Sequence, residues 1–287
     1  MKFKLLLPLI CITSLVGCTS NSEGESSKGL VKDGVAFDQS LVRDSVPEDV
    51  REQKEQSVIG AVMTGTTKTS TSININGQKQ SSSQTVSVKE EFDFVNKKFT
   101  ATQKAGGQKV SYTIQIVGDD VVFSSEYYTE EEAQAQGIDT TLAGMGALFE
   151  MTFKSLFSFD FIPTSEDLEA MAKSFESMGY GGDYSDIIES VFNTMVEHYV
   201  MAGDFENGNV EFGISEPFAL DMQVSGASVN LKYNKLRAVF ENYLCTESVT
   251  SITETIEMSE TYGDYSFYMN MKMTSSTSCT YSYIFAE

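Results

Sequence analysis

Residues 112–123 run Tyr112-Thr113-Ile114-Gln115-Ile116-Val117-Gly118-Asp119-Asp120-Val121-Val122-Phe123. Apolar and polar side chains largely alternate on both sides of a Gly-Asp pair, which is the pattern of two half-buried strands joined by a tight turn. The alternation extends over residues 58–128, where turn signals recur at fairly even spacing: Asn76-Gly77, Asn96-Lys97-Lys98, Gly106-Gly107 and Gly118-Asp119-Asp120. These residues predict an antiparallel meander of about five strands.

The periodicity changes to that of helices over residues 129–203. Thr129 is followed by three glutamates, a capping signature, and apolar residues then recur at helical spacing. We predict three helices here, over residues 142–157, from Thr164 to Gly179, and from Asp186 to Met201. A shorter helix is expected to begin near Pro47, because proline suits a first helical turn and acidic residues follow it.

Strand patterns return after Asp204. The expected strands are Val210–Ile214, Phe218–Val224, Val229–Tyr233 and two long arms, Leu236–Met258 and Asp264–Phe285, hinged near Tyr262-Gly263. The fold class is therefore expected to be α+β: a large, curved, half-barrel-like antiparallel sheet with about three helices packed on its concave face. Residues 30–287 are expected to form a single domain, made of the meander (58–128), the helical insert (129–203) and the second strand set (204–287).

The N-terminal residues have the pattern of an export signal. Lys2 and Lys4 precede an apolar run that is shorter than the roughly 20 residues of a spanning helix. The run ends in Leu15-Val16-Gly17-Cys18, which resembles the lipobox of bacterial lipoproteins. The resemblance implies a signal peptide over residues 1–17 and a lipid on Cys18 that anchors the chain to a membrane. The alternative is an ordinary secretory signal with a chance cysteine.

The residues after Cys18 suit a flexible tether, over residues 18–29, between the lipid and the folded domain. The same resemblance implies a location in the cell envelope. It favours the outer membrane where the host has one, because Thr19 is not the aspartate that retains such proteins at the inner membrane.

Cysteine usage follows from this anchor. Cys11 leaves with the signal and Cys18 is used by lipid, so Cys245 and Cys279 remain in an oxidising compartment, nearly equidistant from the predicted hinge. We predict that they form a structural disulfide, worth roughly 3–4 kcal/mol. Direct pairing would place Ile252 and Ile256 on the face opposite the apolar residues of the second arm, so a bulge or a diagonal bridge is also expected. A redox-active pair is disfavoured, because no Cys-x-x-Cys is present.

Composition excludes some partners. The 287-residue chain is 41% hydrophobic, as in globular proteins, and has a formal net charge of −21. This charge repels nucleic acid and anionic lipid headgroups, and favours cationic partners or simply a soluble surface.

Signatures of catalysis and of metal binding are weak. His198 is the only histidine, which excludes most hydrolase triads and histidine metal sites. An acidic loop could hold Ca²⁺, but its spacing does not match an EF-hand and a plain turn is favoured; its residues are Asp204, Glu206, Asn207, Asn209 and Glu211. No phosphate-binding or nucleophile-elbow motif occurs. We therefore expect no enzymatic activity, no cofactor and no metal.

The segment from Met151 to Ile162 is rich in phenylalanine. Phenylalanine and methionine together form adaptable apolar walls that suit acyl chains. The residues expected to line a hydrophobic cavity are Met145, Phe149, Phe153, Phe157 and Phe161. The alternative is that they fill an ordinary core.

The order of meander, central helices and further strands on a lipid anchor is similar to that of Lol-type lipoprotein carriers and mycobacterial lipoglycan-carrying lipoproteins. The hairpin of residues 112–123 resembles one of theirs. The resemblance implies a non-enzymatic binder or carrier of a hydrophobic ligand such as lipid. The alternative is a structural or adhesive surface lipoprotein that binds proteins or glycans through its acidic, Ser/Thr-rich strands.

Overall fold

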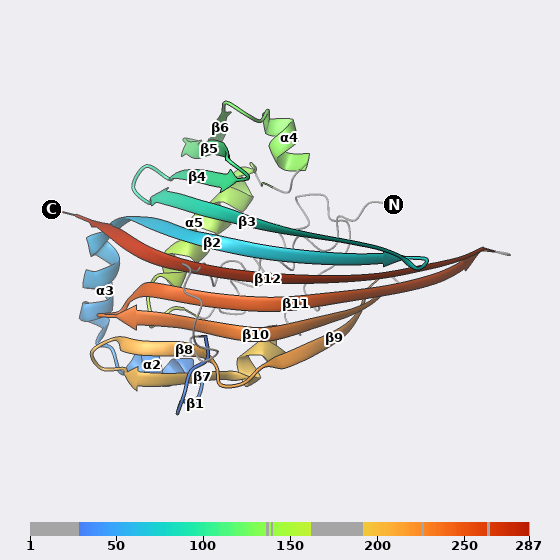
Figure 1. The fold of residues 1–287 in the computed structure, drawn as a ribbon. Coiled ribbons are helices and arrows are strands. Elements are labelled where there is room, and N and C mark those ends of the chain that lie inside the picture. Colours follow the sequence, from blue (N-terminus) through green and yellow to red (C-terminus); the bar gives the residue numbers. More distant parts are fainter. Residues whose placement is uncertain are drawn as a thin grey trace.

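The strands of this protein form one open antiparallel sheet (Figure 1). The computed structural model describes residues 29–135, 138, 140–161, 192–224, 227–262 and 265–286. The 12-stranded sheet has the order β1-β7-β8-β10-β11-β12-β2-β3-β4-β5-β6, with β9 paired to the first half of β10. The expected curved antiparallel sheet is confirmed in this form. The lipobox and the tether lie outside the described residues.

The predicted five-stranded meander is confirmed. Its strands are β2 (Val58–Ile75), β3 (Gln78–Asp93), β4 (Lys98–Ala105), β5 (Gln108–Val117) and β6 (Asp120–Ser125). Each predicted turn signal falls between two of these strands. Asn76 and Gly77 both have positive φ, 50° and 89°, as a two-residue hairpin turn requires.

The pleat gives the sheet two different faces, which we call inner and outer. On the inner face, Ala61, Phe92, Phe99, Ile114 and Phe123 lie directly opposite one another across β2 to β6. All but Phe123 are buried. The outer face carries the alternate residues, which are mostly serine, threonine and charged side chains.

The second strand set contains β7 (Tyr199–Asp204), β8 (Asn209–Ile214), β9 (Phe218–Val224), β10 (Ala227–Glu241), β11 (Leu244–Tyr262) and β12 (Tyr265–Phe285), with the short β1 (Val35–Ala36) at the edge. The expected strand Leu236–Met258 is wrong. The chain turns at Asn242 and Tyr243, whose φ angles are 51° and 73°. Leu236 therefore belongs to β10, and the long hairpin is formed by β11 and β12.

Apolar side chains determine the register of this hairpin. Ile256 lies opposite Met271, and Met258 lies opposite Met269, so the isoleucines and methionines share the inner face. The bulge expected between the two arms is not found, because β11 and β12 pair without a register shift from Glu247 to Tyr262; a shift occurs instead where β11 pairs with β10, between Val239 and Phe240.

The expected Cys245–Cys279 disulfide is not formed. The apolar register places Cys279 opposite Ser248. The Cys245 thiol is buried and free, and its Sγ lies 3.7 Å from the backbone oxygen of Glu247. Burial of a whole apolar face outweighs the gain from one crosslink in setting the register.

The helices are α2 (Gln39–Asp44), α3 (Glu48–Ser57), α4 (Glu130–Ala135) and α5 (Leu142–Ser155), and residues 192–197 are also helical. The helix expected after Pro47 is α3. The predicted capping box is present, since the Thr129 backbone N–H donates to Glu132 Oε2 at 2.8 Å and the Glu132 N–H to Thr129 Oγ1 at 3.2 Å.

The described part of the chain contains five helical segments where about three helices are expected, and three expected positions differ. The first helix of the insert ends at Ser155, before Phe157. The third ends before Tyr199, because Tyr199 and Met201 are buried residues of β7. The second, Thr164 to Gly179, lies outside the described residues. None of the helices in the described part of the chain has the length and apolar character needed to cross a membrane.

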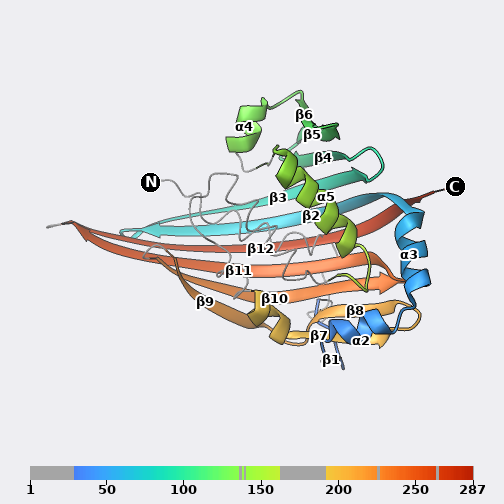
Figure 2. The same cartoon turned by 180° about the vertical axis from the view of Figure 1, so that it is seen from behind.

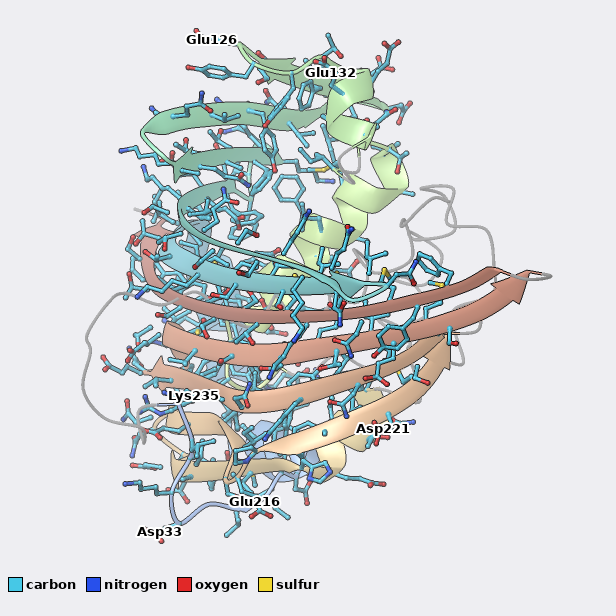
Figure 3. All side chains as sticks on the ribbon, turned by 45° about the vertical axis from the view of Figure 1, so that its right-hand side comes forward. Asp33, Glu126, Glu132, Glu216, Asp221 and Lys235 are labelled. Atoms are coloured by element: carbon cyan, nitrogen blue, oxygen red, sulfur yellow. The ribbon has the colours of Figure 1, made fainter. Side chains whose placement is uncertain are left out.

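Helix α5 crosses the inner face, with α2 and α3 on the same side (Figure 2). The sheet curls toward this side (Figure 3). Two backbone hydrogen bonds join the segment after α5 to the turn between β10 and β11. The Cys245 N–H donates to Leu156 O and the Ser158 N–H donates to Tyr243 O, both at 2.9 Å.

Substitution of Phe157 tests the packing of the segment after α5 against the sheet. It is 1% exposed, and its ring lies 5.1 Å from that of Phe153 and 5.3 Å from that of Phe159. We expect Phe157→Ala to lower the free energy of unfolding by about 3–5 kcal/mol, because it leaves a cavity between α5 and the sheet. Urea denaturation measures the change. Phe285→Ala, at a side chain that is 51% exposed, should change it by less than about 1 kcal/mol.

Candidate functional site

The five residues expected to line a cavity are distributed over three core clusters. Met145 and Phe149 pack with Phe92 and Phe99, whereas Phe153 and Phe157 belong to a cluster around Val58, Ala61 and Leu244. Phe161 packs elsewhere, with ring centroids 5.5 Å from Phe212 and 5.1 Å from Phe240. The structure therefore brings two pairs together but not the whole set. These side chains connect the helical insert to the sheet.

A second apolar region occupies the other half of the inner face. It lies where β9 to β12 extend beyond α2, α3 and α5 (Figures 1 and 2). We call it the methionine face, and its members are Met222, Ile252, Ile256, Met258, Phe267, Met269, Met271 and Met273. Ile256 and Met269 are buried, and the other six are only half-buried.

The methionine face is built by direct cross-strand neighbours. One row runs from Met222 through Val229 and Ile256 to Met271. The adjacent row towards the tip of the hairpin pairs Met258 with Met269. Unbranched thioether side chains can adjust to the shape of a bound apolar molecule. This face therefore has the chemistry of an adaptable apolar wall.

A carboxyl group lies within this apolar face. Glu254 is 3% exposed and is flanked along β11 by Ile252 and Ile256. Its direct neighbours across the strands are Leu231 on β10 and Met273 on β12. Among the described residues, neither carboxyl oxygen of Glu254 has a hydrogen-bond partner. Burial raises the pKa of this carboxyl from 4.5 to about 7.

A second carboxyl on the inner face, Glu90, is less confined. Burial raises its pKa to about 7 as well, and it lies opposite Met63 and Ala101. Glu90 is only half-buried. It lies beside Tyr281, towards the half of the inner face that the helices cover. Glu254 is therefore the carboxyl that the methionine face isolates.

Sequence reasoning missed Glu254. The signal was available in the alternation Ile252, Glu254, Ile256, Met258, where a charged residue takes one apolar position of a strand.

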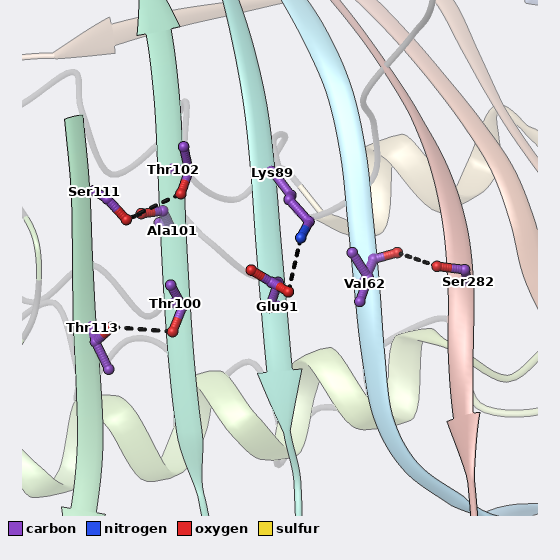
Figure 4. A network of polar contacts seen from close by, with 9 residues as sticks. All are labelled: Val62, Lys89, Glu91, Thr100, Ala101, Thr102, Ser111, Thr113 and Ser282. Carbon is purple, nitrogen blue, oxygen red and sulfur yellow. Dashed lines mark hydrogen bonds and ion pairs between the residues drawn. The ribbon is translucent and has the colours of Figure 1, made fainter. Parts of the chain in front are cut away.

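The outer face is a different kind of surface, which we call the hydroxyl face. Serine and threonine hydroxyls are hydrogen-bonded in pairs across the strands, as Figure 4 shows for Thr100 with Thr113 at 3.1 Å and Thr102 with Ser111 at 3.0 Å. The other pairs are Thr64–Thr280, Ser70–Ser83, Ser251–Ser276 and Thr253–Thr274. A shallow groove of about 470 Å³ is lined by Ser70, Thr71, Ser72, Ser81, Ser82, Ser83, Lys272 and Thr274.

The remaining sequence candidates have structural roles. His198 is exposed and stacks on the ring of Phe218, with centroids 4.1 Å apart. Asp204 accepts hydrogen bonds from the backbone and side-chain nitrogens of Asn207 in the turn between β7 and β8, and these bonds lower its pKa. Over the described ranges, no three His, Cys, Asp or Glu side chains converge closely enough to hold a metal ion.

Several carboxylates lie at the two edges of the sheet. Glu126 and Glu132 lie beside β6 and α4, whereas Asp33, Glu216 and Asp221 lie at the opposite end (Figure 3). Asp221 is only two strands from Glu254, because β9 pairs with β10 and β10 with β11, but it occupies an outer-face position in the row of Asn230 and Thr255.

The site therefore consists of an open antiparallel sheet with an apolar, methionine-rich area on one face.

No protein-family model matches the chain, and no curated protein matches it. Among solved structures it is similar to the ywiB protein from Bacillus subtilis, with 8% identity over 78% of this chain and 97% of that chain, at a TM-score of 0.16. It is also similar to a DUF1329 family protein from Desulfovibrio piger ATCC 29098, with 10% identity over 85% of this chain and 92% of that chain, at a TM-score of 0.13. TM-scores this low carry no argument about fold or function.

Glu254 makes the stability of the protein depend on pH. The folded protein holds the Glu254 proton more tightly than the unfolded chain does, so the stabilising contribution is complete below about pH 4.5 and is lost as the pH rises towards 7. We expect Glu254→Gln to raise the free energy of unfolding by about 1–3 kcal/mol at pH 8 and by little at pH 4.5. Urea denaturation at the two pH values measures this.

Glu257→Gln is the matched control. Glu257 is exposed on the opposite face of the same strand, where it accepts a hydrogen bond from Asn270. Its substitution should change stability equally little at both pH values. An equal effect of the Glu254 and Glu257 substitutions would contradict the assignment of a buried, unpaired carboxyl.

Proposed function

We propose that this protein is a membrane-anchored envelope lipoprotein that binds or carries a hydrophobic ligand, such as a lipid, without catalysis. The methionine face is the observation that carries the proposal. Its members are apolar and mostly half-buried, and they lie on β9, β11 and β12, connected across β10 by the buried Val229. Apolar side chains that remain half-exposed on a broad face are typical of surfaces that receive an apolar partner.

The chemistry of the face suits an alkyl chain better than a rigid ligand. Methionine side chains have several rotatable bonds and contact apolar molecules of different shapes. Each methylene of a chain that leaves water contributes about 0.8 kcal/mol. The formal net charge of −21 disfavours direct insertion into an anionic membrane surface. The ligand is therefore expected to enter the protein rather than the protein the bilayer.

Met271 is the test of the binding face. It lies in the centre of the methionine face, opposite Ile256. In the full chain with Cys18→Ala, which lacks the anchor cysteine, we expect Met271→Gln to weaken binding of a fluorescent naphthylamine probe about tenfold, which corresponds to 1.4 kcal/mol. The adjacent Lys272→Gln, on the outer face, should leave it unchanged. Equal binding by the two variants would contradict the proposal.

A structural or adhesive role is the second candidate, and the hydroxyl face favours it. The groove that contains Lys272 presents hydroxyl groups from three strands on the solvent side. Such a groove offers hydrogen bonds to a glycan or a polar protein surface. In this case Lys272→Gln, and not Met271→Gln, would reduce binding to the partner.

The membrane anchor has its own test. The lipobox Leu15-Val16-Gly17-Cys18 supports acylation of Cys18. We expect a palmitate analogue to label the protein in its host and Cys18→Ala to abolish the label and release the protein from membranes, since two acyl chains anchor stably. A label that persists in Cys18→Ala would contradict this anchor.

A further inference from the structure

The Glu254 side chain is buried without forming a hydrogen bond that would offset its loss of hydration. Glu254 is 3% exposed, and no donor among the described residues reaches either carboxyl oxygen. A carboxyl in this state costs free energy whether it is ionised or protonated, because it has lost its bonds to water and gained none. A ligand that presents a donor at this position would remove that cost.

The chain's own cations on the neighbouring strands are on the wrong face. Lys232 of β10 lies opposite Thr253, and Lys272 of β12 lies opposite Thr255. Residues 253 and 255 alternate with Glu254, so these lysines occupy outer-face positions. Neither can pair with Glu254 without a change of register.

The surroundings of Glu254 are apolar on every side that the strands define. Its row contains Leu220 of β9, Leu231 of β10 and Met273 of β12. The rows on either side contain Ile252 and Ile256 of the same strand. A ligand that reaches the carboxyl must therefore also place an apolar body along the methionine face.

We propose that Glu254 binds the protonated amine of an amphiphile whose alkyl chain lies on the methionine face. This inference rests on the proposed function. In a low-dielectric site, a hydrogen bond between an ammonium and a carboxylate is roughly twice as strong as one between neutral groups. An anionic head group would be repelled by the ionised carboxyl, and a hydroxyl would form only a single-charge hydrogen bond. The net charge of −21 also attracts cationic amphiphiles from solution.

Binding of the amine should depend on pH. The groups that face Glu254 from β9, β10 and β12 are Leu220, Leu231 and Met273, and the nearest titratable residue on this face of β10 is Tyr233, opposite Ile252. Burial raises the pKa of Tyr233 above its ordinary value, so it stays neutral. Glu254 is therefore the group that titrates near pH 7, and amine binding should weaken as the pH falls from 8 to 5.

The experiment uses three 12-carbon amphiphiles below their micellar concentrations. Dodecylamine, dodecanol and dodecanoate compete with the naphthylamine probe for the full chain with Cys18→Ala. At pH 8 we expect dodecylamine to displace the probe at a concentration at least tenfold lower than dodecanol, and dodecanoate to be weakest. Glu254→Gln should bring dodecylamine to the level of dodecanol. Glu257→Gln should keep the preference.

The outcomes distinguish failure of the head-group inference from failure of the proposed function. If all three amphiphiles compete equally in the unsubstituted protein, or if the amine preference survives Glu254→Gln, the inference about the head group is overturned while apolar binding stands. If neither the probe nor any amphiphile binds, the proposed function itself is overturned. Folding of each variant is verified by its unfolding transition.

Discussion

The pairing of β12 with β2 is the constraint on which the rest of the structure depends. It joins Tyr281 to Met63 and Phe285 to Val58, residues from nearly opposite ends of the described chain. Without it, the first meander and the second strand set would be two smaller sheets with additional exposed edges. The seam also contains a polar contact, since the Thr64 and Thr280 hydroxyls lie 3.1 Å apart on the outer face. Because the contact is so distant in sequence, it is expected to form late in folding.

Joining the two halves creates one inner face with two chemistries. Phenylalanine rings dominate where α5 packs, with Phe92 and Phe94 against Phe149 and Phe153. Rigid rings in fixed edge-to-face contact specify one arrangement of helix and sheet. Methionines dominate where β9 to β12 extend further, and they specify shape only loosely. The division of side-chain types therefore follows the division between a packed core and a face that can adapt.

The sequence predicts local turns well and distant choices poorly. Pairs such as Asn76-Gly77 signal a hairpin because they tolerate positive φ. Asn242-Tyr243 carries no such signal, because tyrosine rarely adopts positive φ. Its turn depends on tertiary contacts: the Tyr243 hydroxyl donates to the Glu206 carbonyl, and Gly208 leaves room for the ring. The predicted Cys245–Cys279 disulfide is wrong for a related reason. One crosslink contributes less free energy than burial of the apolar face, and burial of that face sets the register.

Glu254 shows how a site can be recognised where no motif exists. A sequence that only needed a stable sheet would place an apolar residue between Ile252 and Ile256, because an unpaired buried carboxyl destabilises the fold. An external partner gives this cost a use, since the same loss of hydration that raises the carboxyl's pKa to about 7 also strengthens its attraction for a cation. On the outer face many hydroxyls satisfy one another in pairs, and the buried oxygens left without a partner there, Asn74 Oδ1 and Ser278 Oγ, belong to neutral side chains. An unpaired ionisable group therefore distinguishes the inner face as the proposed binding face.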